Sequence, residues 1–445
     1  MTMSRGDFIR GGASVFTIAA AGRAFGLNAP SNRVRLAVMG CHCRGRGFAL
    51  MKSAIAAGGA EIAVVCDVDS RAREVAAAKV KELTGVEPGR VGDVREVLTR
   101  PDVDGLICAA PDHWHATAAA WAMKAGKAIY VEKPCTFCPA EGEVLVRVQK
   151  ETNAVFQMGS QRRSALVSLE AMKALRSGAI GRIRNGRCWY QNRRKPIGAC
   201  PVAAEPSWLD WDKWQGPAPR TDFREGLVHY NWHWFANWGG GECPNNATHF
   251  VDLARWVMNL ANPVRTVSQG GRLYAEGDGW RDWPDTQTCL WQFEGGETIS
   301  WEGTSCQKYP APFNAWAGLL LQGEGGSCYF GPNDCTIYDT KDKVIGHWAP
   351  SHADSAVENN NVDPTQIATV EHLTNFITCV RERNPSGCNQ PVESGVASSL
   401  MAHLGNIALK TGGVVLTDAK TGHIAPASAG RELWSRAYEK GWELV

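Results

Sequence analysis

The chain has 445 residues, of which 44% are hydrophobic and 21% charged, and this length favours two globular domains over a single core. Its 47 Lys+Arg and 45 Asp+Glu leave a formal net charge of +2 without a basic stripe, which argues against nucleic acid or an anionic membrane surface as the main partner. After the N-terminal segment no apolar run reaches the ~18 residues of a membrane span, and the 15 cysteines are spread too widely for a small disulfide scaffold.

Residues 1–30 have the order of an export signal. A charged stretch, Arg5 to Arg10, precedes small and weakly apolar residues from Gly11 to Ala21. The segment resembles a twin-arginine signal in which Gly6 replaces the second arginine. We therefore expect export to the periplasm. The alternative is an N-terminal arm of a cytoplasmic protein, which suits the many cysteines better.

Residues 31–158 are predicted to form a dinucleotide-binding Rossmann domain. The apolar strand Val34–Met39 ends at Gly40, and a short turn leads into a helix. Gly40 and Gly45 fit the first and third glycines of the motif G-x-G-x-x-G, whereas His42 holds the second position. Because that second glycine normally lets the backbone approach the pyrophosphate, His42 leaves open whether the site has lost its cofactor.

Strands and helices then alternate, which predicts a doubly wound parallel sheet. Ligands bind such sheets at the carboxyl ends of their strands. Asp67 ends the second strand, 22 residues after Gly45, where an acid accepts the ribose hydroxyls and repels a 2′-phosphate. The sequence thus favours NAD, while Arg71 and Arg73 leave NADP as the alternative. After Val34–Met39, strands are predicted at Glu61–Asp67, Gly105–Ala109, Ala128–Val131 and Ala154–Met158, with helices at Arg71–Leu83, Val94–Leu98 and Ala140–Glu151 and an alanine-rich helix ending at Lys124.

Residues 159–445 are predicted to form a second α/β domain with an open mixed or antiparallel sheet, because short strands follow one another through Gly-containing turns. Of the 18 tryptophans, 12 lie between Trp189 and Trp301. Indoles stack on the C–H faces of sugars, which favours a carbohydrate ligand, although most of these side chains are expected to pack in the core. Strands are predicted at Arg182–Gln191, Arg265–Leu273, Thr286–Phe293, Thr298–Thr304, Ala317–Gly323, Ser327–Gly331 and Cys335–Tyr338, and helices at Leu166–Arg176, Thr248–Asn259, Pro364–Arg383 and Val392–Thr411.

Three motifs in order carry a family resemblance: the Gly40 turn, Glu132-Lys133-Pro134 and the run from Gly239 to His249. Over residues 34–415 the chain resembles the Gfo/Idh/MocA oxidoreductases, and more narrowly their exported bacterial branch. The resemblance implies an NAD-dependent oxidoreductase that removes hydride from a secondary hydroxyl of a sugar or sugar derivative. It also implies a homo-oligomer built through the open sheet. One offshoot instead hydrolyses glycosides through transient sugar oxidation by tightly held NAD, and a third reading is a non-catalytic sugar- or dinucleotide-binding protein.

The resemblance also implies roles for individual residues. Lys133 is expected to be catalytic at the substrate hydroxyl, with His249 as its partner in proton transfer and Asp252 orienting the imidazole. Asn245 stands where the family often has an aspartate, so it can hydrogen-bond a hydroxyl but cannot ionise. The expected cofactor contacts are Gly40, His42, Arg44, Gly45, Asp67, Ala110, Pro111, His115, Glu132 and Lys133, and the expected substrate contacts are Gln161, Arg163, Trp232, His233, Asn245 and His249.

Two cysteine groups raise a zinc alternative, because both follow strand ends of the same sheet: Cys41-His42-Cys43 and Cys135-x-x-Cys138. The spacing Cys-x-Cys is uncommon in zinc sites, and each group occupies a position that the family uses for its cofactor. We therefore predict no metal site. Cys135 is expected instead to be an exposed thiol beside the nicotinamide.

Overall fold

The computed structural model describes residues 32–42, 45–274, 281–310, 312–349 and 364–444. Arg44 and the signal-like residues 1–30 lie outside these ranges. Among the helices that the structure describes, none combines the length and the apolar character that crossing a membrane requires.

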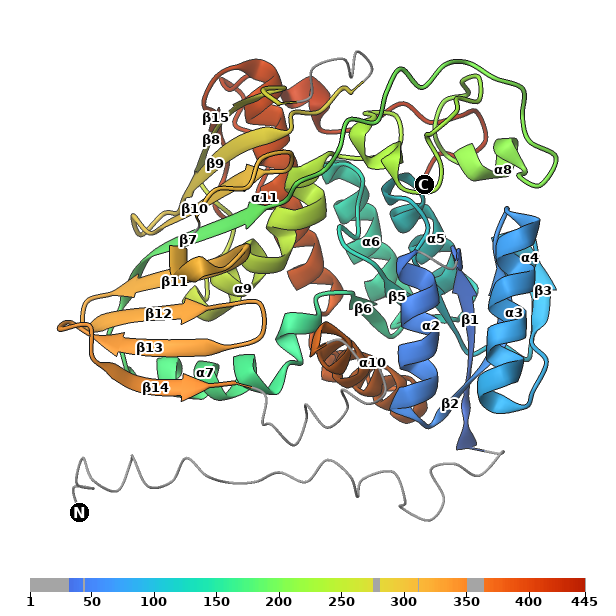
Figure 1. Cartoon of the computed structure of the whole chain (residues 1–445), viewed down its shortest axis with the longest axis horizontal. Helices are drawn as coiled ribbons and strands as arrows, with labels where there is room; N and C mark the ends of the chain where they lie inside the picture. Colours follow the sequence, from blue (N-terminus) through green and yellow to red (C-terminus); the bar gives the residue numbers. More distant parts are fainter. Residues whose placement is uncertain (1–31, 43–44, 275–280, 311, 350–363, 445) are drawn as a thin grey trace.

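The first sheet has six parallel strands in the order β3-β2-β1-β4-β5-β6 (Figure 1). Its central strands are buried on both faces, as the predicted parallel sheet requires. The order reverses between β1 and β4, which places a ligand-binding crevice at the carboxyl ends of these two strands. The strands are β1 (Val34–Met39), β2 (Ala60–Cys66), β3 (Gly89–Val91, not predicted), β4 (Gly105–Cys108), β5 (Ala128–Val131) and β6 (Phe156–Met158), connected by α2 (Arg46–Ala57), α3 (Ser70–Thr84), α4 (Val94–Leu98), α5 (Asp112–Lys124) and α6 (Pro139–Thr152).

The second sheet has nine strands in the order β14-β13-β12-β11-β7-β10-β9-β8-β15, and one of its faces packs on α7 (Leu166–Arg176), α9 (Thr248–Met258) and part of α11 (Figure 1). Strands β7 and β10 are parallel and the other neighbours antiparallel, so the predicted mixed sheet is confirmed. The strands are β7 (Ile183–Gln191), β8 (Arg265–Gly271), β9 (Thr286–Gln292), β10 (Thr298–Thr304), β11 (Ala317–Gly323), β12 (Gly326–Phe330) and β13 (Cys335–Asp339), with β14 (Val344–Trp348) and β15 (Val415–Leu416) as edge strands that were not predicted.

Two C-terminal helices join the halves. Helix α10 (Pro364–Glu382) returns to the first sheet and packs beside α2, where Phe376 enters the same core as Leu50 (Figure 1). Helix α11 (Val392–Thr411) contributes to both cores, Val392 to the first and Met401 to the second. The domain boundary predicted between residues 158 and 159 stays a prediction. Helices α10 and α11, which follow it in the chain, also contribute to the core of the first sheet.

The long irregular stretch between β7 and α9 has its own tryptophan-rich core. It includes the short helix α8 (Trp211–Gln215) and the 3-10 turn η4 (Asn231–Trp234). The stretch reaches the first sheet: the amide of Ser70 donates to the carbonyl of Trp208 at 2.9 Å, and the amide of Asp210 donates to that of Val68 at 3.1 Å. Most of its tryptophans therefore build core, as predicted, and the stretch lies over the end of β2. Its buried indoles are Trp211, Trp214, Trp234 and Trp238, joined by Trp283.

Candidate functional site

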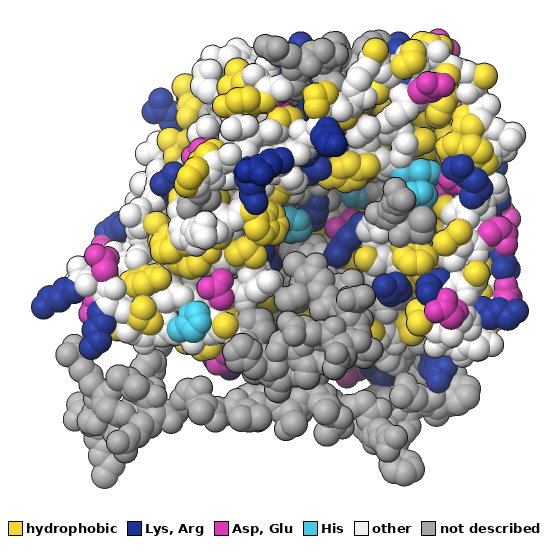
Figure 2. Space-filling model, viewed as in Figure 1, with side chains coloured by type: hydrophobic (Ala, Val, Ile, Leu, Met, Phe, Trp, Pro, Cys, Tyr) yellow, Lys and Arg dark blue, Asp and Glu magenta, His cyan; other side chains and the backbone are white. Residues whose placement is uncertain are grey.

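A cavity of about 740 Å³ lies between the two halves. The space-filling view shows the molecule hollowed there, with histidine and basic side chains visible inside (Figure 2). The cavity runs along the carboxyl ends of β1, β2, β4 and β5 and is closed from the other side by α9 and the second sheet. Of the predicted site residues, those that line it are Gly40, His42, Gly45, Asp67, Ala110, Pro111, His115, Glu132, Lys133, Gln161, Trp232, Asn245 and His249.

The turn after β1 is built for close approach of backbone. Gly40 has φ +80°, and a Cβ there would lie 2.7 Å from the carbonyl oxygen of Ala109. A Cβ at Gly47 would lie 2.0 Å from the carbonyl oxygen of Gly40, so Gly47 lets α2 begin directly over the strand. Gly45 precedes α2 as its N-cap. The packing role of the third glycine thus belongs to Gly47, and the helix N-terminus of α2 at the cavity fits a dinucleotide diphosphate.

His42, which replaces the second glycine, turns toward the tryptophan-rich stretch. Its ring stacks on His229, with the ring centroids 4.0 Å apart and the planes at 16°. His229 in turn places Nε2 2.9 Å from Oδ2 of Asp69 at the N-terminus of α3. His42 lines the cavity from this stacked position. The imidazole is therefore held against His229 and not across the Gly40 turn.

Asp67 lies at the end of β2 with both carboxylate oxygens engaged by backbone. Oδ2 accepts from the amide of Cys41 at 2.7 Å, and Oδ1 accepts from the amide of Asp69 at 2.9 Å. Burial raises the pKa of Asp67 to about 6, although these amide donors act against the shift. The two bonds fix the carboxylate where it can still accept from a ribose hydroxyl in the cavity.

The two arginines that left NADP open are both engaged within the protein. Arg71 pairs with Asp69, with Nη2 2.9 Å from Oδ2, and its guanidinium lies 3.4 Å from the ring centroid of Trp208. Arg73 donates from Nη1 to the carbonyl oxygen of Asp67. Neither contact leaves an arginine directed at a 2′-phosphate, and the acid of the site stays in place. The donor set thus fits NAD.

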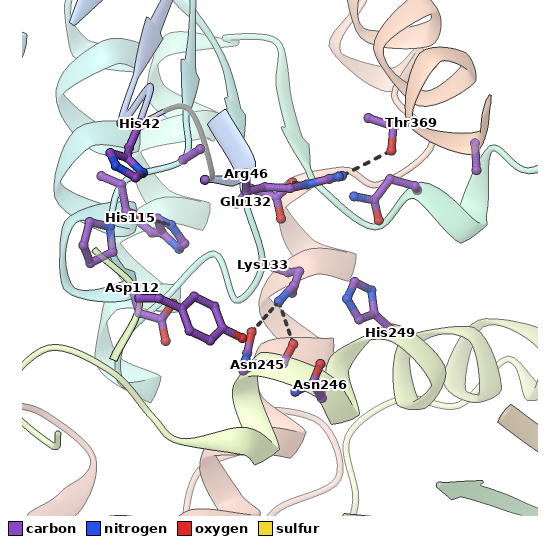
Figure 3. A pocket seen from close by; sticks show the side chains of 18 of the residues that line it. His42, Arg46, Asp112, His115, Glu132, Lys133, Asn245, Asn246, His249 and Thr369 are labelled. Carbon is purple, nitrogen blue, oxygen red and sulfur yellow. Dashed lines mark hydrogen bonds and ion pairs between the residues drawn. The ribbon is translucent and has the colours of Figure 1, made fainter. Parts of the chain in front are cut away.

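Lys133 follows β5 and is held by the second half of the molecule. Its Nζ donates to the carbonyl oxygen of Asn245 at 2.6 Å and to Oδ1 of the same residue at 2.9 Å (Figure 3). Asn245 lies in η5 (Cys243–Ala247), a π-helical turn at the start of α9, and such turns are frequent at functional sites. Burial lowers the pKa of Lys133. The turn therefore presents two oxygens that orient the ammonium.

His249 lies in the first turn of α9 and faces the same space as Lys133 (Figure 3). Its imidazole makes no hydrogen bond within the described part of the chain, so its nitrogens are available to a ligand. Burial lowers the pKa of His249 well below 6.5, and the positive charges of Lys133, Arg162 and Arg46 add to the shift. The imidazole is therefore neutral at pH 7 and able to accept a proton.

Asp252 does not orient His249, so that prediction is wrong. Its carboxylate forms a bidentate pair with Arg163, with both N···O distances 2.8 Å, and it also accepts from Ser398 Oγ at 2.6 Å. Arg163 is only 4% exposed and lies outside the cavity lining. The predicted substrate contact of Arg163 is therefore also wrong, because this buried ion pair directs the guanidinium into the protein core.

His233 does not reach the cavity either, and its prediction as a substrate contact is wrong. Its side chain is 1% exposed, with Nδ1 2.7 Å from the carbonyl oxygen of Tyr230 and Nε2 3.0 Å from Oε1 of Glu242. The same carboxylate oxygen lies 3.1 Å from Nε of Arg194. His233 thus packs behind the lining, where it positions Glu242.

Glu132 and His115 brace the turns that form the cavity floor. Glu132 Oε1 accepts from Nε of Arg46 at 3.0 Å, and Nη2 of Arg46 donates to Oγ1 of Thr369 in α10 at 3.3 Å (Figure 3). The ring nitrogens of His115 lie 2.6 Å from the carbonyl oxygen of Pro134 and 2.8 Å from that of Ala110. These contacts tie β4, β5, α2 and α10 together around Lys133.

Several lining residues were not predicted from the sequence, because no local motif marks them. They include Arg46, Arg162, Tyr190, Trp316 and Thr369.

The cysteines near the strand ends are packed. Burial raises the pKa of Cys135 to about 12, and its Sγ lies 3.5 Å from Oγ of Ser399. The expectation of an exposed thiol beside the nicotinamide is therefore wrong. Cys41 is buried as well, whereas Cys43 lies outside the described residues. Across the described ranges no group of three His, Cys, Asp or Glu side chains has an arrangement that could hold a metal ion.

Part of the chain is similar to proteins that are named for an activity. Levoglucosan dehydrogenase of Pseudarthrobacter phenanthrenivorans is 28% identical over 176 residues, which are 39% of this chain and 38% of that protein. The NAD(+)-dependent scyllo-inositol 2-dehydrogenase of Bacillus subtilis is 33% identical over 174 residues, 38% of this chain and 47% of the relative. Glycosyl hydrolase family 109 protein 1 of Shewanella sp. strain ANA-3 is 29% identical over 149 residues, 33% of this chain and 32% of the relative. Each match thus spans less than half of the relative's length.

The fold as a whole also has solved counterparts. Levoglucosan dehydrogenase in complex with NADH and L-sorbose aligns with a TM-score of 0.66 at 18% identity, covering 86% of this chain and 99% of that structure. This likeness shows that the two proteins share the same fold. Residues 34–160 match the model of an oxidoreductase family with an NAD-binding Rossmann fold, Gfo/Idh/MocA. The match to the Gfo/Idh/MocA oxidoreductases thus extends over the NAD-binding domain, residues 34–160.

Proposed function

We propose that this protein is an NAD-dependent oxidoreductase that removes hydride from a secondary hydroxyl of a sugar or sugar derivative. The observation that carries the proposal is one continuous cavity in which the Gly40 turn and Asp67 are followed by Lys133 and His249. The first two features fit a dinucleotide, and the last two can handle the proton of a hydroxyl. The levoglucosan and scyllo-inositol dehydrogenases support the choice of a polyol substrate.

The division of labour follows from the protonation states. NAD held by the Gly40 turn and Asp67 would supply the hydride acceptor for the carbon that carries the hydroxyl. The ammonium of Lys133, oriented by Asn245, donates a hydrogen bond to the hydroxyl oxygen. The neutral imidazole of His249 takes the hydroxyl proton as the carbonyl forms. One C–H bond and one O–H bond break, and the products are a ketone or lactone and NADH.

The test is the stoichiometry of NADH. Purified protein with excess NAD is incubated with a panel of sugars, inositols and anhydrosugars, and NADH is followed at its absorbance band while the carbohydrate product is identified by mass spectrometry. The proposal expects one NADH for each carbonyl formed. Turnover without NADH accumulation would contradict it.

The glycosyl hydrolase relative favours a second candidate, an NAD-dependent glycoside hydrolase. In that activity the sugar would be oxidised, its glycosidic bond eliminated, water added to the resulting double bond and the ketone reduced again, so that NAD is regenerated. The two functions separate in one assay with aryl glycosides. A hydrolase releases the phenol without added NAD and without net NADH, whereas the dehydrogenase leaves the glycosidic bond intact.

The third reading, a binding protein without catalysis, depends on His42 having disabled the cofactor site. The stacking of His42 on His229 argues against it, because it holds the ring against the tryptophan-rich stretch. Mass spectrometry of the small molecules released on denaturing the protein decides the matter. Release of NAD, or its binding on titration, removes the form of this reading in which the cofactor site is lost. If NAD is neither released nor bound, that form stands.

Export and assembly extend the proposal. Residues 1–30 support export through a twin-arginine route, which fractionation of cells that express the full chain would test.

The outer face of the second sheet supports a homo-oligomer, since Phe313 stacks on Tyr329 there and is 46% exposed. Sedimentation of Phe313→Ser against the parent protein tests that surface, with dissociation of an oligomer as the expected result.

A further inference from the structure

Two adjacent arginines in the 3-10 turn η3 (Gln161–Arg163) face opposite ways. Arg163 is directed into the core by Asp252. Arg162 lines the cavity, with its guanidinium carbon 3.9 Å from the ring centroid of Phe250. The turn connects β6 of the first sheet to α7 beneath the second, so Arg162 lies where the two halves meet. Its charge reaches His249, whose pKa it helps to lower.

Arg162 carries a positive charge that no carboxylate of the described ranges neutralises in an ion pair. Its Nη1 donates to the carbonyl oxygens of Gly331 at 3.2 Å and Pro332 at 3.1 Å. Within the described ranges no carboxylate forms an ion pair with it, and Nε and Nη2 have no acceptor. Burial lowers the pKa of Arg162 to about 10, so the group is still charged at neutral pH. Burial strengthens the attraction between opposite charges, so the open Nε and Nη2 of this guanidinium favour an anionic ligand.

We propose that Arg162 binds a carboxylate of the substrate, and hence that the substrate is an acidic sugar derivative, of the uronate or aldonate class. The inference rests on the proposed oxidoreductase function and narrows its substrate. The open edge of the guanidinium, formed by Nε and Nη2, matches the two oxygens of a carboxylate in a side-on pair.

The surroundings of Arg162 agree with a small polyhydroxylated acid. The aromatic side chains of Tyr190 and Trp316 also line the cavity, and aromatic side chains pack well on the C–H groups of a sugar ring. Arg46 and Arg194, the other arginines of the lining, are already paired with Glu132 and Glu242. Among the lining arginines Arg162 alone has no ion pair within the described ranges, and one guanidinium balances the one charge of a carboxylate, whereas a phosphate monoester carries about two.

The test uses matched substrates that differ only in the anionic group. Initial rates of NADH formation are compared for D-glucuronate against D-glucose, D-galacturonate against D-galactose and D-gluconate against D-glucitol, with D-glucose 6-phosphate as the phosphate arm. Each compound is also titrated calorimetrically into the NAD-loaded protein. The variants are Arg162→Gln, the conservative Arg162→Lys, and Arg193→Gln as a control at an exposed arginine outside the cavity lining.

The proposal expects kcat/KM for the best acid to exceed that of its neutral partner, and Arg162→Gln to lower it about 10- to 100-fold with the neutral compound little changed. Arg162→Lys should keep part of the preference, and Arg193→Gln all of it. A preference of the parent protein for neutral or phosphorylated compounds would overturn the inference, whether or not Arg162→Gln folds. If no compound yields NADH, the proposed function fails, and calorimetry alone decides: acid binding that Arg162→Gln abolishes supports the inference, and absence of acid binding overturns it.

Discussion

Lys133 donates two hydrogen bonds to one residue, to the carbonyl oxygen of Asn245 at 2.6 Å and to its Oδ1 at 2.9 Å. The pair joins the end of β5 in the first sheet to the π-helical turn before α9 in the second half. The ammonium is thus oriented before any substrate enters, and both oxygens that orient it are neutral. Burial lowers the pKa of Lys133. The nearby carboxylates of Glu132 and Asp112 act against this shift, whereas the neutral Asn245 does not.

Replacing Asn245 by aspartate should therefore shift the alkaline side of the activity profile. In Asn245→Asp a carboxylate would face the ammonium, raise the pKa of Lys133 and keep it protonated to higher pH. The alkaline limb of kcat/KM is expected to move upward by about one pH unit. Profiles of the parent protein and of Asn246→Asp, a neighbouring residue of the same turn, provide the comparison. An unchanged limb in Asn245→Asp would show that Lys133 does not set it.

His249→Ala should lower kcat about 100-fold or more, because no group remains to take the hydroxyl proton. NAD affinity should stay within about twofold, since the imidazole lies on the side of the cavity away from the Gly40 turn. In the parent protein the pKa of His249 lies well below 6.5, so the base form is present at neutral pH and is lost only as the pH falls through that lowered value. The acid limb of kcat/KM is therefore expected below pH 6.5, and a limb at or above that pH would contradict the assigned base.

The first half of the site could be predicted because its signals are local. An apolar strand that ends in Gly40, followed 22 residues after Gly45 by Asp67, specifies both the fold and the strand ends where ligands bind. His42 stayed ambiguous because its orientation depends on His229, which lies far along the chain in an irregular stretch. No local pattern indicates such a contact.

That contact leads to a prediction for cofactor affinity. His229→Ala removes the ring on which His42 stacks and the contact with Asp69, so the turn after β1 loses its support. NAD is expected to bind about 3- to 10-fold more weakly, with kcat at saturating NAD little changed. His42→Ala should weaken NAD binding to a similar extent. Fluorescence titration of both variants with NAD measures the effect. Tighter binding in His42→Ala would mean that His42 crowds the diphosphate.

Arg162 and Arg163 show where sequence reasoning ended on the substrate side. Both are arginines of one short turn, and only Asp252, 89 residues further on, determines which of them is turned inward. His233 was misplaced for a similar reason, since its partner Glu242 lies across a loop and not within a helix. The predicted helix placed His249 and Asp252 on one face, yet tertiary packing assigned the carboxylate to Arg163.

The ion pair of Arg163 and Asp252 should therefore matter for stability and not for substrate binding. Within the described ranges, Arg163→Met leaves the buried carboxylate of Asp252 with the side chains of Gln390 and Ser398 as its hydrogen-bond donors, and the free energy of unfolding should fall by about 3 kcal/mol. Arg176→Met, at an exposed arginine of α7, should change it by less than about 0.5 kcal/mol. Denaturant unfolding provides both values, and KM of the folded Arg163→Met protein should match that of the parent. A raised KM with an unchanged free energy of unfolding would show instead that Arg163 contacts the substrate.

The central claim is that Lys133 acts on the substrate hydroxyl in a cavity whose other end binds NAD. The decisive measurement compares Lys133→Ala with Lys150→Ala, an exposed lysine of α6, for both NAD binding and NADH formation. The account predicts that Lys133→Ala binds NAD within about twofold of the parent while NADH formation falls by about 100-fold or more, and that Lys150→Ala changes neither. Undiminished NADH formation in Lys133→Ala would contradict it.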